Sequence, residues 1–532
     1  MPASLYSILE VQSLANPLNS GVFDTNTTMA TNLTCGNGLS IFPFVASTGY
    51  TFQTADIGHW LYLRSGTSWQ PGWYQITGLI GSSAVVNANW GQSVAINNQS
   101  TYWNGIGSAN SLSSGTWAID YTQSATARTT YSDISIISTT SIASAGNSFN
   151  PAMVGNSIRV LGGTGFTPGI YIINSVIGSS ATLDRSPGLL TSTGGSAYLG
   201  GAFSDFSSAL FGCSTISDKC IIYAKADATY NHTANYYVSS TACIPTIVGY
   251  GTYRYDQQKV NITVGSGTTV LSYSTYMKVA NLSFNGFGNT NTYASFNVNN
   301  GSWFYNCDFQ NMTGNARTRG NYIKCLINNV GFMDANGFDD CVITNCVGTG
   351  RTLFYSCNVQ DCIIYNNTAL SHLFRMDPGS ATRVWSNNTF YNNNTPYLIY
   401  KVNDAISTDF IYNNLFVGTA GTVFECNGYH PYAFDMNTNA YYNNGQINSI
   451  GQNVFGGWIS CVDNEIVLTG NPFINASAGD FRINDIAGAG KLVKNNGLLP
   501  LNPFFTIPNY MNIGAVQTKD PYLNLQNTGG FI

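Results

Sequence analysis

Seven charged or ionisable side chains cluster in one stretch of a chain that carries few charges elsewhere. Only 8% of its 532 residues are Asp, Glu, Lys or Arg. Two nearby carboxylic acids can act as the acid and the base, or the acid and the nucleophile, of glycoside hydrolysis, and a basic side chain beside them can abstract a proton. The residues that invite this chemistry are Asp339, Asp340, Arg351, Asp361, His372, Arg375 and Asp377.

These residues also have a structural interpretation. Asp339-Asp340 falls where the chain is expected to turn, and Asp377 begins an Asp-Pro-Gly turn. Arg351 and Arg375 can neutralise these carboxylates. Because the spacing defines neither a carboxylate pair nor a lyase motif, we assign no catalytic, cofactor-binding or metal-ligating residue, and enzymatic activity stays an open question.

Cysteine and histidine do not form a metal motif. The chain has 12 Cys and 4 His, and it contains no Cys-x-x-Cys. The histidines are scattered, at His59, His232, His372 and His430. Structural zinc needs closely spaced ligands, so we expect no zinc site and no cofactor.

Several of the cysteines instead recur at a fixed interval. Cys325, Cys341 and Cys357 are 16 residues apart, and Cys346 and Cys362 share that spacing. Two positions after each of the first three cysteines the chain has an apolar residue, namely Ile327, Ile343 and Val359. The same pattern continues with Asn in place of Cys, at Asn388-Thr-Phe390 and Asn414-Leu-Phe416.

This repeat predicts a parallel β-helix. Successive coils of such a solenoid lie about 4.8 Å apart in register, so one position of every coil forms a column. Small thiols stack well in the core, and Asn amides can hydrogen-bond along the column. We therefore predict a right-handed parallel β-helix in which Cys325, Cys341 and Cys357, and likewise Cys346 and Cys362, stack as reduced thiols. A disulfide between neighbouring coils is the alternative.

Composition supports an all-β fold and excludes two classes of partner. The chain contains 33 Tyr, 29 Phe and 55 Gly, and it lacks long amphipathic helical patterns. Its net charge is −5 and it has no basic run, so nucleic-acid binding is not expected. The sequence contains no apolar stretch of roughly 18 residues, so no helix is expected to span a membrane. Residues 1–20 do not resemble a secretory signal.

An internal duplication precedes the solenoid. Phe52–Gly58 aligns with Phe149–Gly155 without gaps, and the match ends with Ile-Gly-Ser-Ser-Ala at residues 80–84 and 177–181. Alternating apolar residues around a Pro-Gly turn predict strand, turn and strand in each copy. Tandem modules of this kind typically act as spacers, platforms or binding units. The aromatics Trp60, Trp69 and Trp73 of the first copy become Ser157, Phe166 and Ile170 in the second, so either a sugar-stacking patch or core packing distinguishes the first copy.

These patterns divide the chain into six parts. A Gly-rich joint, Thr193–Gly201, separates the modules from a helix-like segment, Ala202–Cys213, that is suited to capping a solenoid. The predicted parts are an N-terminal attachment segment (1–33), β-module copy 1 (34–130), β-module copy 2 (131–201), the β-helix N-terminal cap (202–240), the right-handed parallel β-helix (241–517) and a C-terminal tail (518–532).

The C-terminal part carries the most specific resemblance. Asn471–Ile474, Gly479–Asn484 and Asn512–Gln517 resemble the terminal coil of the right-handed parallel β-helix repeat proteins, the pectate-lyase-like superfamily. The duplicated module followed by a Gly-Gly joint and a β-helix is similar to structural proteins of tailed bacteriophages. This resemblance implies a virion protein, made in the host cytoplasm, that acts as a tail spike, tail fibre or capsid decoration.

The same resemblance implies a homo-oligomer, in particular a homotrimer, joined to other virion proteins through its N-terminal part. It also implies a projecting body that adsorbs to host surface polysaccharide through Tyr, Trp and Asn. Two alternatives remain open. One is a polysaccharide depolymerase, either a lyase or a glycosidase, built on the same β-helix. The other is a surface adhesin or filament subunit of a prokaryote.

Overall fold

The computed structural model is nearly all β and divides into two compact units. The first unit comprises residues 1–230 and 238–260, and the second comprises residues 231–237 and 261–532. No helix among the residues it describes could span a membrane. The described residues are 7–16, 18–20, 30–35, 44–57, 60–67, 72–87, 113–120, 129–150, 153, 156–206, 208–210, 220–232, 237–238, 245–251, 256–264, 271–273, 277–286, 296–297, 302–316, 320–348, 352–355, 357–376, 383–402, 409–427, 434–448, 459–494, 496–497 and 512–515.

The duplicated sequence folds into two closed barrels of the same topology, which confirms the two tandem β-modules. The strand order around the first is β2-β3-β6-β5-β4-β7, and around the second β8-β9-β12-β11-β10-β13. The first contains β2 (Ala30–Cys35), β3 (Phe44–Ser47), β4 (Trp60–Thr67), β5 (Gly72–Ile80), β6 (Ser83–Asn87) and β7 (Ser113–Asp120). The second contains β8 (Thr129–Ile136), β9 (Ser141–Ala143), β10 (Ser157–Gly162), β11 (Gly169–Ile177), β12 (Ser180–Leu183) and β13 (Gly195–Leu199).

The identical Ile-Gly-Ser-Ser-Ala phrases form equivalent hairpin turns. Gly81 and Gly178 both have φ +61°, a conformation that favours glycine. The N–H of Phe52 donates to the carbonyl of Ser82, and the N–H of Phe149 donates to that of Ser179, each at 3.2 Å. Each turn therefore fixes a buried Phe at the same place in its barrel core.

The first unit also contains three parallel strands. β1 (Ser7–Val11) pairs with β14 (Cys220–Lys225), which pairs with β17 (Pro245–Tyr250). The segment predicted to serve attachment thus contributes a strand. The predicted cap helix, Ala202–Cys213, lies only partly among the described residues. There the Asp205 carboxylate accepts from the Ser208 N–H at 2.8 Å, as at a helix N-cap, and Phe203, Phe206 and Leu210 are buried.

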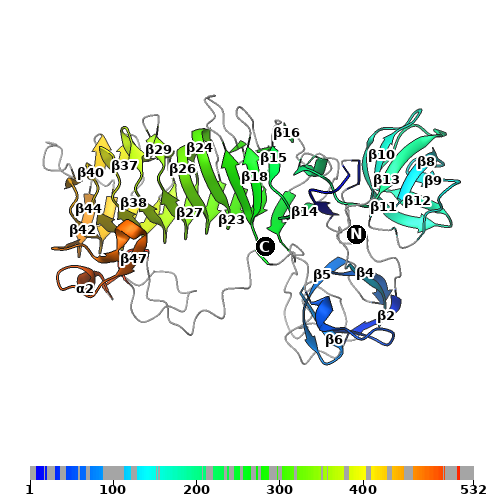
Figure 1. Cartoon of the computed structure of the whole chain (residues 1–532), viewed down its shortest axis with the longest axis horizontal. Coiled ribbons are helices and arrows are strands. Elements are labelled where there is room, and N and C mark those ends of the chain that lie inside the picture. Colours follow the sequence, from blue (N-terminus) through cyan, green and yellow to red (C-terminus); the bar gives the residue numbers. More distant parts are fainter. Residues whose placement is uncertain are drawn as a thin grey trace. The chain divides into compact units, whose positions relative to one another are not determined.

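The second unit is a parallel β-helix with three faces (Figure 1). Face 1 contains β20 (Lys278–Ala280), β23 (Ser302–Tyr305), β25 (Gly320–Ile323), β27 (Gly337–Asp339), β31 (Asn358–Gln360), β35 (Val384–Ser386), β38 (Asp409–Tyr412), β41 (Phe434–Asn437) and β44 (Ile459–Asp463). Face 2 contains β21 (Leu282–Gly286), β24 (Asp308–Ala316), β26 (Leu326–Asp334), β28 (Val342–Thr344), β32 (Ile363–Tyr365), β36 (Thr389–Tyr391), β39 (Leu415–Val417), β42 (Ala440–Tyr442) and β45 (Ile466–Val467).

Face 3 begins on the second half of β26, where Met333 pairs with Phe354. It contains β30 (Thr352–Tyr355), β34 (His372–Met376), β37 (Tyr397–Val402), β40 (Thr422–Asn427) and β43 (Gln446–Asn448). A two-stranded sheet, β29 (Val347–Gly348) with β33 (Thr368–Ala369), lies between faces 2 and 3 in the order of the chain. The remaining short strands are β15 (Tyr230–His232), β16 (Tyr237–Val238), β18 (Val260–Val264), β19 (Leu271–Tyr273) and β22 (Phe296–Asn297).

Two columns of residues turn the chain from face 1 to face 2. Residues of the outer column have φ between 50° and 58°, which is tolerated best by Asn and Asp among residues with a side chain. They are Asn281, Asn306, Lys324, Asp340, Asp361, Asn387, Asn413, Thr438 and Asn464. The residue that follows in each coil belongs to the inner column, which from Cys307 onward consists of Cys307, Cys325, Cys341, Cys362, Asn388, Asn414, Asn439 and Glu465.

The inner column confirms stacked cysteines but corrects their predicted partners. Cys341 stacks on Cys325 as expected, yet its next neighbour is Cys362, because Val342 pairs with Ile363. Cys346 pairs in position with Asn367, and Cys357 lies before β31 on face 1. The fixed 16-residue interval fails because the continuous β26 of one coil is replaced in the next coil by separate strands, β28 and β30, with the short β29 between them in the chain. That coil therefore spans 21 residues.

Candidate functional site

The structure separates the charged residues singled out in the sequence into two groups. Asp339, Asp340 and Asp361 meet at the turn between faces 1 and 2, on neighbouring coils. His372 and Arg375 lie on face 3, in β34. Arg351 and Asp377 lie outside the described residues. The five described side chains therefore do not form one groove.

The acidic corner is formed by Asp339, Asp340 and Asp361. Burial raises the pKa of Asp361 to about 6, and the negative charges of Asp339 and Asp340 add to the effect, while a hydrogen bond from Asn387 opposes it. The Asn387 Nδ2 donates to Asp361 Oδ1 at 3.1 Å. Desolvation likewise raises the pKa of Asp339 to about 6, against the attraction of Lys324. The Asp361 side chain is half-buried, whereas that of Asp339 is exposed.

A carboxyl group with a pKa near 6 can hold a proton close to neutral pH. That is the property required of the general acid in glycoside cleavage. Within the described ranges, however, no three His, Cys, Asp or Glu side chains are grouped to hold a metal ion. The raised pKa values of Asp339 and Asp361 suit the acidic corner to proton exchange.

Face 3 carries a row of aromatic and charged side chains on successive coils. Tyr355, Arg375, Tyr400 and Glu425 pair in register from β30 to β40. All four are half-buried. The Arg375 guanidinium lies 5.3 Å from the centre of the Tyr355 ring, and Phe332 packs edge-on against the same ring at 5.4 Å. We call this row, with Phe332, His372 and Tyr397, the aromatic face.

His372 is the buried member of the aromatic face. Its Nδ1 lies 3.3 Å from the Thr352 hydroxyl, and its Nε2 lies 3.2 Å from the Ser371 hydroxyl. The imidazole ring is buried, with its centre 3.9 Å from that of Tyr400 and 5.8 Å from that of Tyr397. The two hydroxyl partners fix the orientation of the imidazole. Because that ring packs against Tyr397 and Tyr400, His372 in turn positions both tyrosines.

A buried charge cluster lies beneath the aromatic face. Lys401, which follows Tyr400 in β37, is 1% exposed, and its Nζ lies 2.8 Å from Asp409 Oδ2. Arg383 donates its backbone N–H to Asp409 Oδ1 at 3.0 Å, and its guanidinium lies 3.6 Å from the same oxygen. Asp409 belongs to face 1 and Lys401 to face 3. This cluster therefore ties the two faces together through the core.

Face 2 carries tyrosines as well, but they are packed against the C-terminal segment of the chain. Phe481 lies 5.0 Å from Tyr365 and 5.6 Å from Tyr391, and Phe473 lies 5.7 Å from Tyr391. The two Phe residues come from an antiparallel pair, β46 (Phe473–Asn475) and β47 (Asp480–Ile483), which precedes α2 (Gly490–Val493). Gly514 donates to the Asn413 carbonyl at 2.7 Å. The segment expected to form a terminal coil is instead a hairpin on the side of the β-helix.

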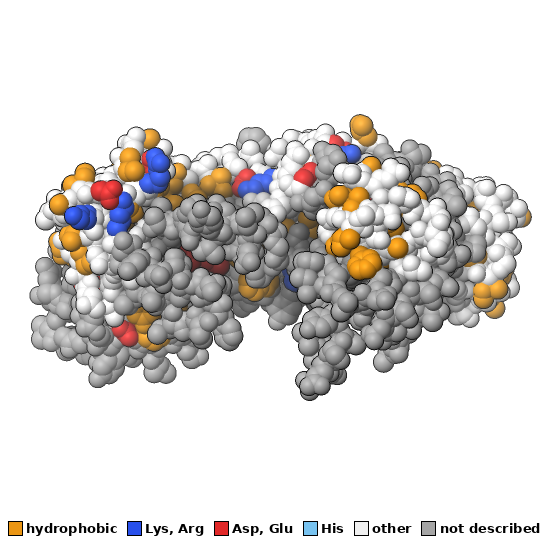
Figure 2. All heavy atoms as spheres, turned by 90° about the horizontal axis from the view of Figure 1, so that it is seen from below, with side chains coloured by type: hydrophobic (Ala, Val, Ile, Leu, Met, Phe, Trp, Pro, Cys, Tyr) orange, Lys and Arg blue, Asp and Glu red, His pale blue; other side chains and the backbone are white. Residues whose placement is uncertain are grey.

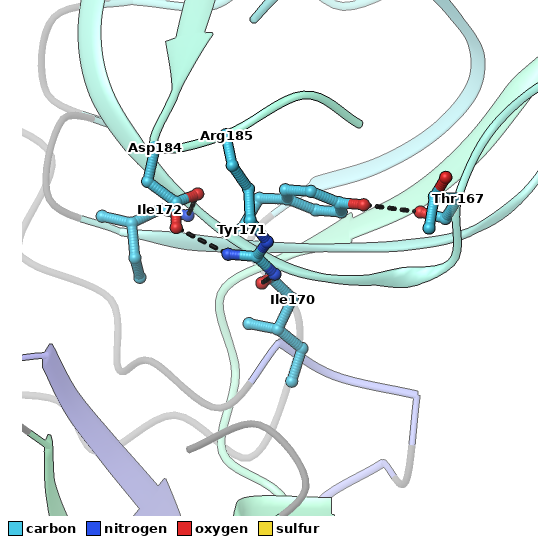
Figure 3. A network of polar contacts seen from close by, with 6 residues as sticks. All are labelled: Thr167, Ile170, Tyr171, Ile172, Asp184 and Arg185. Atoms are coloured by element: carbon cyan, nitrogen blue, oxygen red, sulfur yellow. Dashed lines mark hydrogen bonds and ion pairs between the residues drawn. The ribbon is translucent and has the colours of Figure 1, made fainter. Parts of the chain in front are cut away.

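The second barrel contains a separate polar network (Figure 3). Arg185 donates to Asp184 at 2.6 Å and to the Ile170 carbonyl at 2.5 Å, and its guanidinium lies 4.3 Å from the Tyr171 ring centre. The Tyr171 hydroxyl donates to the Thr167 carbonyl at 2.7 Å. Every group has a partner within the barrel, so this network fixes β11. Side chains of Trp60, Trp69 and Trp73 lie outside the described residues, whereas Ser157, Phe166 and Ile170 of the second copy are buried.

The cysteines whose side chains are described are all buried and free of disulfides. Desolvation raises the pKa of Cys346 to about 12 and that of Cys426 to about 11, so these thiols stay protonated. The described surface seen in Figure 2 is mostly uncharged, with Lys and Arg scattered among Asp and Glu.

Comparison with known proteins gives a similarity to a bacteriophage protein among the solved structures. No family model and no curated protein matches the chain. The tailspike protein gp49 from Pseudomonas phage LKA1 is similar over 65% of this chain and 64% of its own, at 9% sequence identity. The match thus spans less than two thirds of the tailspike's length. The TM-score is 0.14.

The sequence pattern missed most of the aromatic face. His372 and Arg375 were singled out for their charge, but Tyr355 and Tyr400 were not connected with them. The interval from Tyr355 to Arg375 differs from that between Arg375 and Tyr400, so no fixed period marks the row. A usable signal was present inside β34 and β37, where a polar or aromatic residue recurs after three positions, in His372-x-x-Arg375 and Tyr397-x-x-Tyr400.

Proposed function

We propose that this protein is a structural protein of a bacteriophage virion, in the role of tail spike, tail fibre or head decoration, that adsorbs to host surface glycans. The observation that carries the proposal is the aromatic face. Aromatic rings held on a rigid β surface bind sugar rings at low conformational cost, because few rotamers are lost on binding. Arg375 and Glu425 add hydrogen-bonding groups to the same row.

The mechanism follows from rigidity. Successive coils pair in register along face 3, so the spacing of Tyr355, Arg375 and Tyr400 is set before a ligand arrives. A glycan can then contact several coils at once, and weak contacts add up through multivalency.

Three further features belong to the proposal. Following the resemblance to tailed-phage structural proteins, we propose a homotrimer. We also propose that its N-terminal part joins other virion proteins and that the two barrels act as spacers. Immunogold labelling of particles and mass spectrometry of purified virions test this location, and absence of the protein from particles would contradict it.

Adsorption is tested by binding of the protein to host cells and to their extracted polysaccharide. Tyr355→Ala combined with Tyr400→Ala should reduce binding at least tenfold. The matched control is Tyr412→Ala, which removes a half-buried tyrosine from face 1. Equal binding by wild type, double variant and control would show that face 3 does not bind glycans.

A second candidate function is glycan cleavage at the acidic corner. The observation that favours it is the raised pKa of Asp361 and Asp339, both about 6. Release of reducing ends from host polysaccharide, abolished by Asp361→Asn, would support a depolymerase. Release that persists in Asp361→Asn and Asp339→Asn would remove this site.

A further inference from the structure

The row on face 3 matches a glycan that lies along the axis of the β-helix. Tyr355, Arg375, Tyr400 and Glu425 occupy one position on four successive coils. Neighbouring parallel strands are about 4.8 Å apart, which is close to the length that one pyranose ring adds to a chain. A glycan in this orientation therefore presents about one sugar ring to each side chain of the row.

We infer that face 3 selects a glycan in which an isolated carboxylate-bearing sugar is flanked by neutral sugars, with its carboxylate at Arg375. The inference rests on the proposed function and names the ligand class of the same site. Guanidinium and carboxylate are complementary in charge and shape, since two parallel N–H groups can meet two oxygens.

Arg375 is held ready for such a contact. Its guanidinium lies over the Tyr355 ring at 5.3 Å, and the edge-on contact with Phe332 fixes that ring in turn. Stacking of this kind orients the planar guanidinium before binding, so less side-chain entropy is lost.

The coils on either side of Arg375 present tyrosines. Tyr355 precedes it and Tyr400 follows it, and the Tyr400 ring is held by His372 at 3.9 Å and by Tyr397 at 5.8 Å. Aromatic faces favour the apolar faces of sugar rings and offer no positive charge to a carboxylate. Neutral sugars therefore fit on both sides of the acidic one.

Glu425 limits the charge density of the ligand. It stands two coils beyond Arg375, at a separation of about 10 Å in a parallel stack. A second carboxylate at that sugar would face Glu425 and be repelled, whereas the hydroxyls of a neutral sugar can donate to it. A polymer with a carboxylate on every ring is accordingly disfavoured.

Isothermal titration with three probes tests the inference. The first is a gellan oligosaccharide, whose repeat carries a single glucuronate among neutral sugars, and the second is the same oligosaccharide after reduction of the carboxyl group to an alcohol. The third is an oligogalacturonate, which carries a carboxylate on every ring. We expect the gellan probe to bind about tenfold more tightly than its reduced form, as for one charge-assisted hydrogen-bonded pair. The oligogalacturonate should bind more weakly than the gellan probe.

Two substitutions and a control sharpen the result. Arg375→Gln should remove the difference between the gellan probe and its reduced form, while Glu425→Gln should strengthen binding of the oligogalacturonate. Arg482→Gln changes an exposed arginine of the C-terminal hairpin and should alter neither. A gellan probe that binds no better than its reduced form, or a preference that survives Arg375→Gln, would overturn the inference.

Failure of the inference can be told apart from failure of the proposed function. If Tyr355→Ala with Tyr400→Ala reduces cell binding but carboxyl reduction of the probe has no effect, face 3 binds glycans and the ligand class is wrong. If the tyrosine variants leave cell binding unchanged, the proposed function and this inference fail together.

Discussion

Faces 2 and 3 of the β-helix both carry tyrosines but use them differently. On face 2, Tyr365 and Tyr391 pack against Phe473 and Phe481 of the chain's own C-terminal segment. On face 3, Tyr355 contacts Arg375 and Tyr400 contacts His372, all within the aromatic face. An outward aromatic row on a solenoid can thus serve either intramolecular packing or a ligand. Which of the two roles it serves depends on whether another segment of the chain packs against the outer side of the row.

The difference predicts that face 2 contributes to stability and face 3 to binding. It also predicts that face 3 depends on the core beneath it, where Lys401 and Asp409 join it to face 1. Five substitutions in four tests, ordered from the largest expected effect to the smallest, examine these statements.

Asp409→Asn should have the largest effect. The change leaves Lys401 and Arg383 buried without their shared negative charge, which costs about 3–5 kcal/mol in comparable buried pairs. Urea unfolding measures the loss, and glycan binding should weaken as well, because Lys401 adjoins Tyr400. Unfolding at the wild-type midpoint would show that the cluster does not tie the faces together.

Phe481→Ala should destabilise the second unit by about 3 kcal/mol, as expected for removal of a buried Phe side chain. Its ring packs on Tyr365 and Tyr391, so the loss falls on face 2. Glycan binding by the folded protein should be unchanged. A variant that keeps its stability but loses binding would reverse the assigned roles of the two faces.

Tyr391→Ala and Tyr400→Ala form a matched pair of half-buried tyrosines. We expect Tyr391→Ala to cost about 2 kcal/mol of stability, because its ring packs between two buried Phe side chains, and to spare binding. Tyr400→Ala should cost less stability and reduce binding several-fold. Thermal unfolding and titration on both variants provide the comparison, and equal effects on both properties would contradict it.

Asp361→Asn should give the smallest effect and a distinct pH dependence. The folded-state pKa of Asp361, about 6, lies above the ordinary value of 3.8 for an Asp side chain, so its protonation favours the folded state. The stabilisation is fully present below about pH 4 and is lost as the pH rises through about 6. The Asn variant should therefore be more stable than wild type at pH 7, with little difference at pH 4. A pH profile of unfolding identical in both proteins would refute the shift.

The sequence predicted the architecture better than the site. Stacked Cys and Asn revealed the parallel β-helix because inward residues repeat in columns, where the Asn414 amide bonds to Asn388 at 2.9 Å and to Asn439 at 3.0 Å. The predicted pairing of Cys341 with Cys357 was wrong because the coils differ in length. A coil becomes longer where its face 2 and face 3 strands are separate, as β28 and β30 are, than where they form one strand such as β26. The neighbour of Cys346 on the next coil is Asn367, so Cys and Asn can occupy the same inward position on successive coils.

Outward residues left a weaker signal. Nothing inside the strands reports what packs on their outer side, so Tyr391 and Tyr400 look alike in sequence. For the same reason, the sequence predicts a terminal coil where the structure has the hairpin on face 2. Apolar residues at both outward and inward positions, as in Leu415-Phe-Val417, were the available sign that face 2 is covered on both sides.

Hydroxyl-radical footprinting of the native protein, with and without bound host polysaccharide, tests the central claim most directly. Mass spectrometry then reports the oxidation rate of each tyrosine. The account predicts that polysaccharide protects Tyr355, Tyr397 and Tyr400 and leaves the rates of Tyr365 and Tyr391 unchanged. Protection of face 2 tyrosines, or no protection on face 3 at a polysaccharide concentration that saturates binding, would contradict it.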